Sequence, residues 1–200
     1  MEPQEERPPP RESVPLPWVV RFAPLVRAGG TVLDVACGGG RHLRYFRARG
    51  HPVVGVDQDV RGLADLAGQT GVGIVQADLE QGEPWPLAGR QFAAVVIANY
   101  LNMPLWPVLR AALGPEGVLI IQTFGRGQGR HGRPSSPEFL IRSGASLEWA
   151  QQAGLQIVAY EHGRLTGDRP AIIQRLCAVN PGAPAADLDG DPEPWPLGPS

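Results

Sequence analysis

Short apolar runs alternate with amphipathic stretches between residues 31 and 179. The runs are rich in Val, Ile, Leu and Ala, and none approaches the ~20 apolar residues that a membrane-spanning helix needs. Near-continuous apolar runs are typical of strands covered on both faces, as in a parallel sheet between two layers of helices. The pattern predicts strands over residues 31–36, 52–57, 73–78, 91–99, 117–124, 155–161 and 171–179.

Helical periodicity fills most of the intervals between these strands. Ser146 is a suitable N-cap for the last helix, and Gly154 is a suitable terminator. The last two strands follow each other directly, which indicates a closing hairpin and one antiparallel strand. Helices are expected over residues 39–49, 60–67, 104–113 and 146–153, and an amphipathic segment over residues 17–26 is expected to pack on the sheet.

Both ends of the chain differ from its middle. Residues 1–13 and 181–200 are rich in proline and acidic residues, a composition that favours disorder. Residues 14–180 form the single predicted domain and carry sixteen arginines against twelve acids, a net charge of +4. This excess is milder than the strongly basic character of a typical nucleic-acid-binding domain.

The composition excludes several kinds of chemistry. All eighteen basic residues are arginine, which excludes a phosphate-binding P-loop and a pyridoxal Schiff base because both need a lysine. Two cysteines, Cys37 and Cys177, are too few for a disulfide framework and lack zinc-binding spacing. No secretory signal is visible, so we expect a cytoplasmic protein. The four histidines are scattered along the sequence, so no metal site is expected.

The loop after the first strand distinguishes between two ligand classes. In open α/β sheets, ligands bind at the carboxyl ends of the strands. Asp34 precedes the glycines Gly38 and Gly40, and Leu43 stands where a dinucleotide loop has its third glycine. A carboxylate at this turn would repel a pyrophosphate. It would favour S-adenosylmethionine (SAM), whose sulfonium and ammonium groups are cationic.

Two further acids end the next two strands. Asp57 lies nineteen residues after Gly38, where an acid accepts hydrogen bonds from ribose hydroxyls in both ligand classes. Asp78 ends the third strand and is placed to accept a hydrogen bond from an adenine amino group. Together with Asp34, these acids predict an adenosine-containing ligand.

Two segments carry a family resemblance. Residues 32–42 (VLDVACGGGRH) and 50–57 (GHPVVGVD) resemble the SAM-binding half of class I methyltransferases, and most closely the small bacterial tellurite-resistance-type branch. The resemblance extends over about residues 18–179. It implies an α/β, Rossmann-like sheet of seven mostly parallel strands, with helices on both faces and the last strand antiparallel.

The resemblance also implies a set of cofactor-binding residues. Asp57 would hold the ribose, Gln58 would lie along the adenine, and Asp78 would bind the adenine amine. The implied set, beginning with four residues around the methionine part, is Asp34, Ala36, Gly38, Gly40, Asp57, Gln58, Asp78, Leu79 and Asn99. Cys37 is expected to be a small loop residue, and a role as a nucleophile is less favoured.

The acceptor side carries less signal, because methyl transfer from a sulfonium depends mainly on positioning two reactants. Asn99 and Tyr100 follow the fourth strand, where amino-methylating families carry a proline-containing box, and the prolines are absent here. Arg41 and His42 begin the helix after the glycine loop, where cations oppose the helix dipole. These four residues are the catalytic candidates, although His42 suits a packing or capping role better than that of a general base.

A glycine- and arginine-rich loop over residues 125–133 (GRGQGRHGR) follows the fifth strand. It is either a solvated loop or a lid that orders over an anionic acceptor through Arg126, Arg130 or Arg133. RNA binding is less favoured because the loop lacks aromatic residues that would stack on bases. The segment around Trp18 and Phe22 could likewise be a flap over the cofactor instead of a packing helix.

The sequence therefore predicts a methyltransferase that transfers the methyl group of SAM to a small-molecule acceptor. Three alternatives remain: an NAD-linked oxidoreductase, a non-catalytic SAM-binding regulator and an RNA methyltransferase. No membrane association is expected. The identity of the acceptor and the oligomeric state cannot be derived from the residues.

Overall fold

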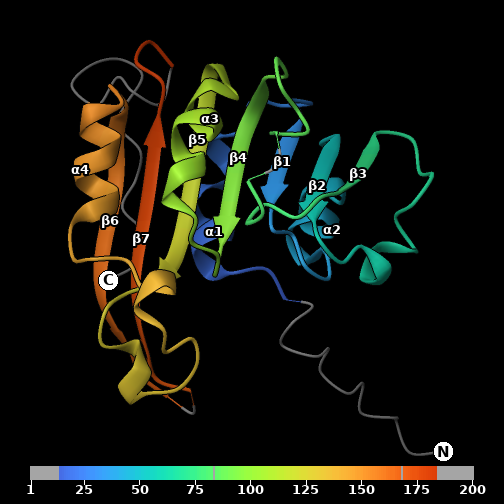
Figure 1. Ribbon diagram of the computed structural model, residues 1–200. Coiled ribbons are helices and arrows are strands. Elements are labelled where there is room, and N and C mark those ends of the chain that lie inside the picture. Colours follow the sequence, from blue (N-terminus) through green and yellow to red (C-terminus); the bar gives the residue numbers. More distant parts are fainter. Residues whose placement is uncertain (1–13, 83, 168, 184–200) are drawn as a thin grey trace, which may run out of the picture.

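A computed structural model describes residues 14–82, 84–167 and 169–183, so residues 1–13 and 184–200 of the predicted tails lie outside the described residues. Seven strands form one sheet in the order β3-β2-β1-β4-β5-β7-β6 (Figure 1). The first five pair in parallel, and β7 pairs antiparallel with both β5 and β6. The predicted fold is confirmed. The strands are β1 (Val32–Val35), β2 (Val53–Asp57), β3 (Val72–Gln76), β4 (Phe92–Ala98), β5 (Leu113–Phe124), β6 (Gln156–Leu165) and β7 (Ala171–Val179).

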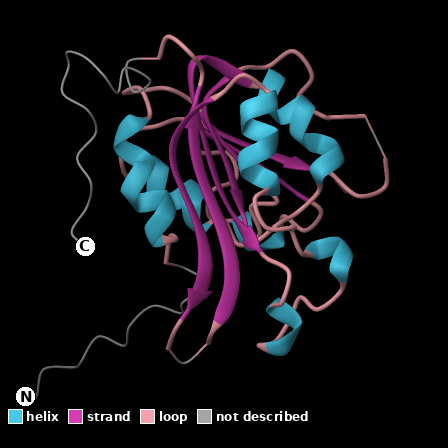
Figure 2. Cartoon of the chain, turned by 90° about the vertical axis from the view of Figure 1, so that its left-hand side faces the viewer, coloured by secondary structure: helices cyan, strands magenta, loops and turns pink. Residues whose placement is uncertain are grey.

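Helices cover both faces of the sheet, as the edge-on view in Figure 2 shows. Helices α1 (Pro17–Phe22) and α2 (Arg41–Arg47) lie on one face, and α3 (Trp106–Ala111) and α4 (Ala145–Gln152) lie on the other. Alternate strand residues face the two layers because successive side chains of a strand point in opposite directions. Val32 packs with α1 and α2, whereas Leu33 packs with α3 and α4.

Two local expectations were wrong. The helix expected over residues 60–67 is reduced to a 3₁₀ turn, η3 (Arg61–Leu63), followed by turns. Gly144, with φ +78°, is the N-cap of α4, and Ser146 lies inside the helix. The Ser146 hydroxyl is buried and donates to Gln174 Oε1 on β7 at 3.0 Å. This tertiary hydrogen bond uses the hydroxyl that was expected to cap the helix. The other 3₁₀ turns are η2 (Ala23–Leu25), η4 (Met103–Leu105), η5 (Gln128–Arg130) and η6 (Pro137–Phe139).

Segments from both ends of the chain pack onto the middle of the sheet. The expected amphipathic segment buries Trp18 and Phe22, and the Trp18 indole N–H donates to the Leu176 carbonyl of β7 at 3.3 Å. Residues 181–183, which the sequence assigned to the tail, continue from β7, and Ala183 is buried. Within the described ranges, no helix is both long and apolar enough to cross a membrane.

Candidate active site

The predicted site lies where β1 and β4 separate at their carboxyl ends. The strand order runs outward from β1 to β2 and β3 on one side, and from β4 to β5 on the other. Ala36, directly after β1, and Asn99, directly after β4, have φ values of +53° and +59° and are the two non-glycine residues with positive φ in the described part of the chain. Strained backbone of this kind gathers at ligand sites. Its position here coincides with the switch point where open α/β sheets bind ligands.

The glycine loop after β1 needs its glycines for two different reasons. Gly38 and Gly40 have φ values of +51° and +76°, a region that residues with a Cβ rarely adopt. A Cβ on Gly40 would also lie 2.4 Å from Leu63 Cδ2, whereas one on Gly39 would meet nothing within 4 Å. Packing and backbone conformation therefore both require glycine at position 40, whereas there is room for a larger residue at position 39.

Asp57 joins the end of β2 to this loop. Its Oδ2 accepts the Gly38 N–H at 2.7 Å, and its Oδ1 accepts the Asp59 N–H at 2.9 Å. Each carboxylate oxygen has a further lone pair, so Asp57 can accept ligand hydroxyls without losing these backbone bonds. The carboxylate is held in place before any ligand arrives.

A small cavity of about 130 Å³ brings together residues from the ends of β1, β2, β3 and β4. Asp78 forms part of its wall, and its Oδ1 accepts the Glu80 N–H at 2.9 Å. Five residues of the predicted cofactor set meet here with Tyr100 and two neighbours. The lining residues are Ala36, Asp57, Gln58, Ala77, Asp78, Leu79, Glu80 and Tyr100.

Tyr100 is a poor candidate for a base in this cavity. Burial raises the pKa of its phenol, and the nearby carboxylates of Glu80, Asp78 and Asp57 raise it further. Because the ordinary value is already about 10, the phenol stays protonated at neutral pH. Tyr100 can donate a hydrogen bond or pack on a flat ring, but it cannot remove a proton.

Asp34 is buried beneath the first turn of α2. Neither carboxylate oxygen has a hydrogen-bond partner among the described residues, and His42 Nδ1 lies 3.5 Å from Asp34 Oδ2. The His42 ring is buried too, and its Nε2 accepts the Leu16 N–H at 3.3 Å. His42 therefore connects the N-terminal segment to Asp34, which fits a packing role. Arg41 starts α2 and is partly buried.

A buried carboxylate without a donor is costly unless a partner neutralises it. Asp34 thus fits a cationic ligand group near the glycine loop, as the SAM ammonium would provide. Cys37 is the other residue of this loop with a potentially reactive side chain. Burial, and then the charges of Asp34 and Asp57, raise the pKa of its thiol well above its usual range. Cys37 remains a protonated thiol, and Cys177 is fully buried in the core.

A larger hollow of about 560 Å³ lies on the other side of the switch point, and this volume is in the range of small-molecule sites. Asn99 lines it from the end of β4, Leu16 from the N-terminal segment and Arg133 from the glycine- and arginine-rich loop. Arg126 does not line it. The remaining lining residues are Gln122, Phe124, Gln128, His131, Gly132, Leu165, Arg169, Pro170, Ala171 and Ile173.

A hydrogen-bond chain orients Asn99 at the edge of this hollow. Arg175 on β7 donates from Nη1 to Glu161 at 2.8 Å and from Nε to Gln122 Oε1 at 2.8 Å. Gln122 Nε2 in turn donates to Asn99 Oδ1 at 3.5 Å. Because the Asn99 oxygen is engaged, its amide N–H₂ group remains to donate to a ligand.

Sequence reasoning did not find Gln122, Arg175, Arg169 or Leu16. Gln122 carried a detectable signal, since it is a polar residue near the carboxyl end of an otherwise apolar strand. Arg169 and Leu16 reach the hollow from the β6–β7 turn and the N-terminal segment. Only the three-dimensional structure brings these segments together.

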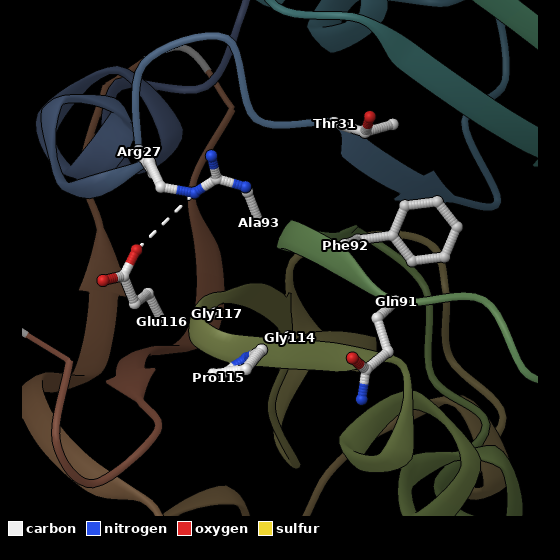
Figure 3. Close-up of a pocket in the computed structure, with 9 residues that line it drawn as sticks. All are labelled: Arg27, Thr31, Gln91, Phe92, Ala93, Gly114, Pro115, Glu116 and Gly117. Carbon is white, nitrogen blue, oxygen red and sulfur yellow. Dashed lines mark ion pairs between the residues drawn. The ribbon is translucent and has the colours of Figure 1, made fainter.

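A third hollow, of about 500 Å³, lies at the opposite edge of the sheet (Figure 3). It is lined by the start of β4 and by residues 114–117 of β5, and Arg27 pairs with Glu116 across it at 3.5 Å. The amino ends of parallel strands rarely bind ligands in this class of sheet. Of these three hollows, the two at the carboxyl ends of the strands form the candidate site.

Residues 32–114 match the family model described as methyltransferase domain. The matched region runs from β1 to the start of β5 and contains the glycine loop and the small cavity. Over these residues the chain is similar to a methyltransferase domain. No curated protein sequence matches the chain at a significant level.

Solved methyltransferase structures share the fold. A SAM-dependent methyltransferase from Mesorhizobium loti is 19% identical, with 82% of this chain and 97% of that chain covered and a TM-score of 0.63. A TehB-like methyltransferase from Corynebacterium glutamicum is 22% identical, with 82% and 86% covered and a TM-score of 0.57. The 1,6-didemethyltoxoflavin-N1-methyltransferase of Burkholderia thailandensis, solved with bound 1,6-didemethyltoxoflavin and S-adenosylhomocysteine, is 19% identical, with 82% and 76% covered and a TM-score of 0.59.

Proposed function

We propose that this methyltransferase binds SAM across the ends of β1 to β4 and methylates a small molecule held in the larger hollow. The observation that carries the proposal is the position of Asn99 and Tyr100. These two consecutive residues line different hollows, so the small cavity and the larger one meet at the end of β4. A cofactor in the first and an acceptor in the second would come together at that point.

The proposed cofactor contacts follow from the chemistry of each group. Asp34 would neutralise the ammonium of the methionine part, with Ala36, Gly38 and Gly40 providing the backbone around it. Asp57 would accept the ribose hydroxyls, while Gln58 and Leu79 would pack along the adenine and Asp78 would accept its amine. When bound, SAM supplies an electrophilic methyl group on a sulfonium.

The protein's own part in the reaction is to position two reactants and exclude water, which can supply much of the acceleration for a displacement of this kind. Asn99 would donate a hydrogen bond that orients the acceptor. Tyr100, protonated, would close the cofactor cavity on the acceptor side. The similar Burkholderia thailandensis structure is a methyltransferase with the small molecule 1,6-didemethyltoxoflavin bound, which supports a small-molecule acceptor.

Calorimetric titration with SAM, S-adenosylhomocysteine and NAD tests the cofactor part of this proposal. Asp57→Ala should weaken binding of both SAM and S-adenosylhomocysteine at least tenfold, since hydrogen bonds to charged groups contribute about 1.5–3 kcal/mol. Asp59→Ala is the matched control, because Asp59 is exposed, pairs with Arg61 and does not line the cavity.

Binding of NAD in place of SAM would overturn the proposal in favour of an oxidoreductase. Equal losses in the Asp57 and Asp59 variants would remove Asp57 from the site. Intact SAM after incubation with a cell extract, despite tight binding, would favour a non-catalytic regulator.

A further inference from the structure

Two sets of arginines in this protein differ in their partners. Six of them pair with carboxylates at N···O distances of up to 3.5 Å: Arg21, Arg27, Arg44, Arg61, Arg142 and Arg175. Five others form no side-chain hydrogen bond, ion pair or ring contact with any residue that the structure describes: Arg126, Arg130, Arg133, Arg164 and Arg169. All five belong to the loop after β5 or to the β6–β7 hairpin, which project together from one end of the sheet (Figure 1).

Two of these five arginines line the larger hollow. Arg133 comes from the loop and Arg169 from the hairpin turn, and His131 lies beside Arg133 in the chain and in the lining. No carboxylate appears among the described residues of that lining. A guanidinium without a carboxylate partner presents several N–H donors, and its fork geometry matches carboxylate or phosphate.

The rest of the hollow is suited to a carbon framework. Leu16, Phe124, Leu165 and Ile173 line it, together with Pro170. Asn99 and Gln122 supply amide groups at the end near the cofactor cavity. The lining thus has an amide-bearing end, an apolar wall and a cationic rim, an arrangement typical of sites that bind most of a ligand by apolar contact and orient it by a few polar groups.

We infer that the methyl acceptor is a small organic anion, whose anionic group is held by Arg133 and Arg169 and whose nucleophilic atom lies near Asn99. This inference rests on the proposed function and names its substrate class. A lone pair of the nucleophile forms the bond to the methyl carbon, the carbon–sulfur bond breaks, and its electron pair stays on sulfur. A proton on the attacking atom passes to solvent. The anionic group anchors the acceptor and is not itself methylated.

RNA is the competing ligand for an arginine cluster. Single-stranded RNA binding uses aromatic side chains as stacking platforms beside the cationic groups. Phe124 lines the hollow with Arg133 and Arg169 but is partly buried, and the exposed Phe139 lines a different hollow, so no row of exposed aromatic rings accompanies the two arginines among the described residues. The hollow favours a small molecule.

Acids and their uncharged amides provide the test. The protein, saturated with S-adenosylhomocysteine, is titrated with benzoate and benzamide, 4-hydroxybenzoate and 4-hydroxybenzamide, and indole-3-acetate and indole-3-acetamide. At least one acid should bind about tenfold or more tightly than its amide, since one charged hydrogen bond is worth that much. Arg133→Gln and Arg169→Gln should each remove most of this preference, and the double variant all of it.

Arg130→Gln is the matched control, because Arg130 lies in the same loop, has no partner among the described residues and does not line the hollow. It should keep the preference, and all variants should keep the affinity for S-adenosylhomocysteine. Equal binding of every acid and its amide would overturn the inference, as would an equal loss in the Arg130 variant. Tighter binding of selenite or of an oligouridylate would overturn it in favour of an inorganic oxyanion or RNA.

Failure of the proposed function gives a different result. In that case the unmodified protein would not bind S-adenosylhomocysteine at all. If the protein binds S-adenosylhomocysteine but shows no preference for acids over amides, only the inference about the acceptor is overturned.

Discussion

The two halves of the candidate site are built from opposite charges. The cofactor cavity is lined by the carboxylates of Asp57, which ends β2, and of Asp78 and Glu80, which follow β3, and the buried Asp34 lies near the end of β1. Around the larger hollow, the described charged residues are Arg133 and Arg169. The first half suits a cationic ligand and the second an anionic one. In a methyl transfer that joins a sulfonium to an anionic acceptor, this division would bring each reactant to its own side.

The halves also differ in what holds them. Backbone conformation and tight packing shape the glycine loop, whereas a chain of side-chain hydrogen bonds orients Asn99 on the acceptor side. A substitution in the loop should therefore act on cofactor binding and folding together. A substitution in the hydrogen-bond chain should lower turnover with less effect on cofactor binding.

Gly40→Ala should have the largest effect. It places a Cβ 2.4 Å from Leu63 Cδ2 at φ +76°, and left-handed backbone costs a residue with a Cβ about 1–2 kcal/mol before any clash. We expect SAM binding to be lost and the melting temperature to fall, measured by calorimetric titration and thermal unfolding. Gly39→Ala, with open space at its Cβ, should stay close to the unmodified protein in both. If the two variants behaved alike, packing at Gly40 would not shape the loop.

Gln122→Leu should separate the two halves. It removes the bonds to Arg175 and Asn99, so the free energy of unfolding should fall by about 1–3 kcal/mol. Misplaced reacting groups should lower kcat by about ten- to hundredfold, with SAM affinity within about twofold of the original. The measurements are chemical denaturation, and kinetics with an acceptor found in the screen.

Thr123→Val is the control for the hydrogen-bond chain. Thr123 is the next residue on β5, and its buried hydroxyl has no partner among the described residues. Its removal should cost little stability and little activity. A kcat loss as large as that of Gln122→Leu would show that any change on β5 disturbs the site.

Cys37→Ala should have the smallest effect. Turnover should stay within about twofold, because the raised pKa keeps the thiol protonated. The folded state holds this proton more tightly than the unfolded state, so the resulting stability is fully present below about pH 9 and is lost as pH rises above it. Chemical denaturation across this range should show a shallower alkaline decline in the variant. A large loss of turnover at neutral pH would revive Cys37 as a nucleophile.

The cofactor half was more accessible to sequence reasoning than the acceptor half. Its residues follow short strands within one stretch of chain, so the spacing of Asp34, Gly38 and Asp57 already encodes which groups are neighbours. The structure brings Ala36, Asp57, Gln58, Asp78 and Leu79 into one cavity. Their contacts with SAM remain a prediction.

The acceptor half depends on contacts that no local pattern encodes. Arg169 and Leu16 are far apart in the sequence but line the same hollow. Ser146 is of a residue type that favours the N-cap, yet its hydroxyl donates a hydrogen bond to Gln174. The prediction of a helix over residues 60–67 was wrong for a related reason. Leu63 is buried beside the glycine loop and needs only one turn to reach it.

The bond between Trp18 and Leu176 joins residues 158 positions apart and has a consequence for synthesis on the ribosome. Strand β7 lies between β5 and β6, so the nascent chain cannot complete the sheet until residues 171–179 have emerged. Translation adds about 5–20 residues per second, which leaves the earlier strands several seconds in which to pair alone. A nascent chain would therefore assemble the cofactor half first. It would gain the acceptor pocket only after β6 and β7 have emerged, so a product truncated before β6 would lack the wall that Leu165 and Ile173 provide.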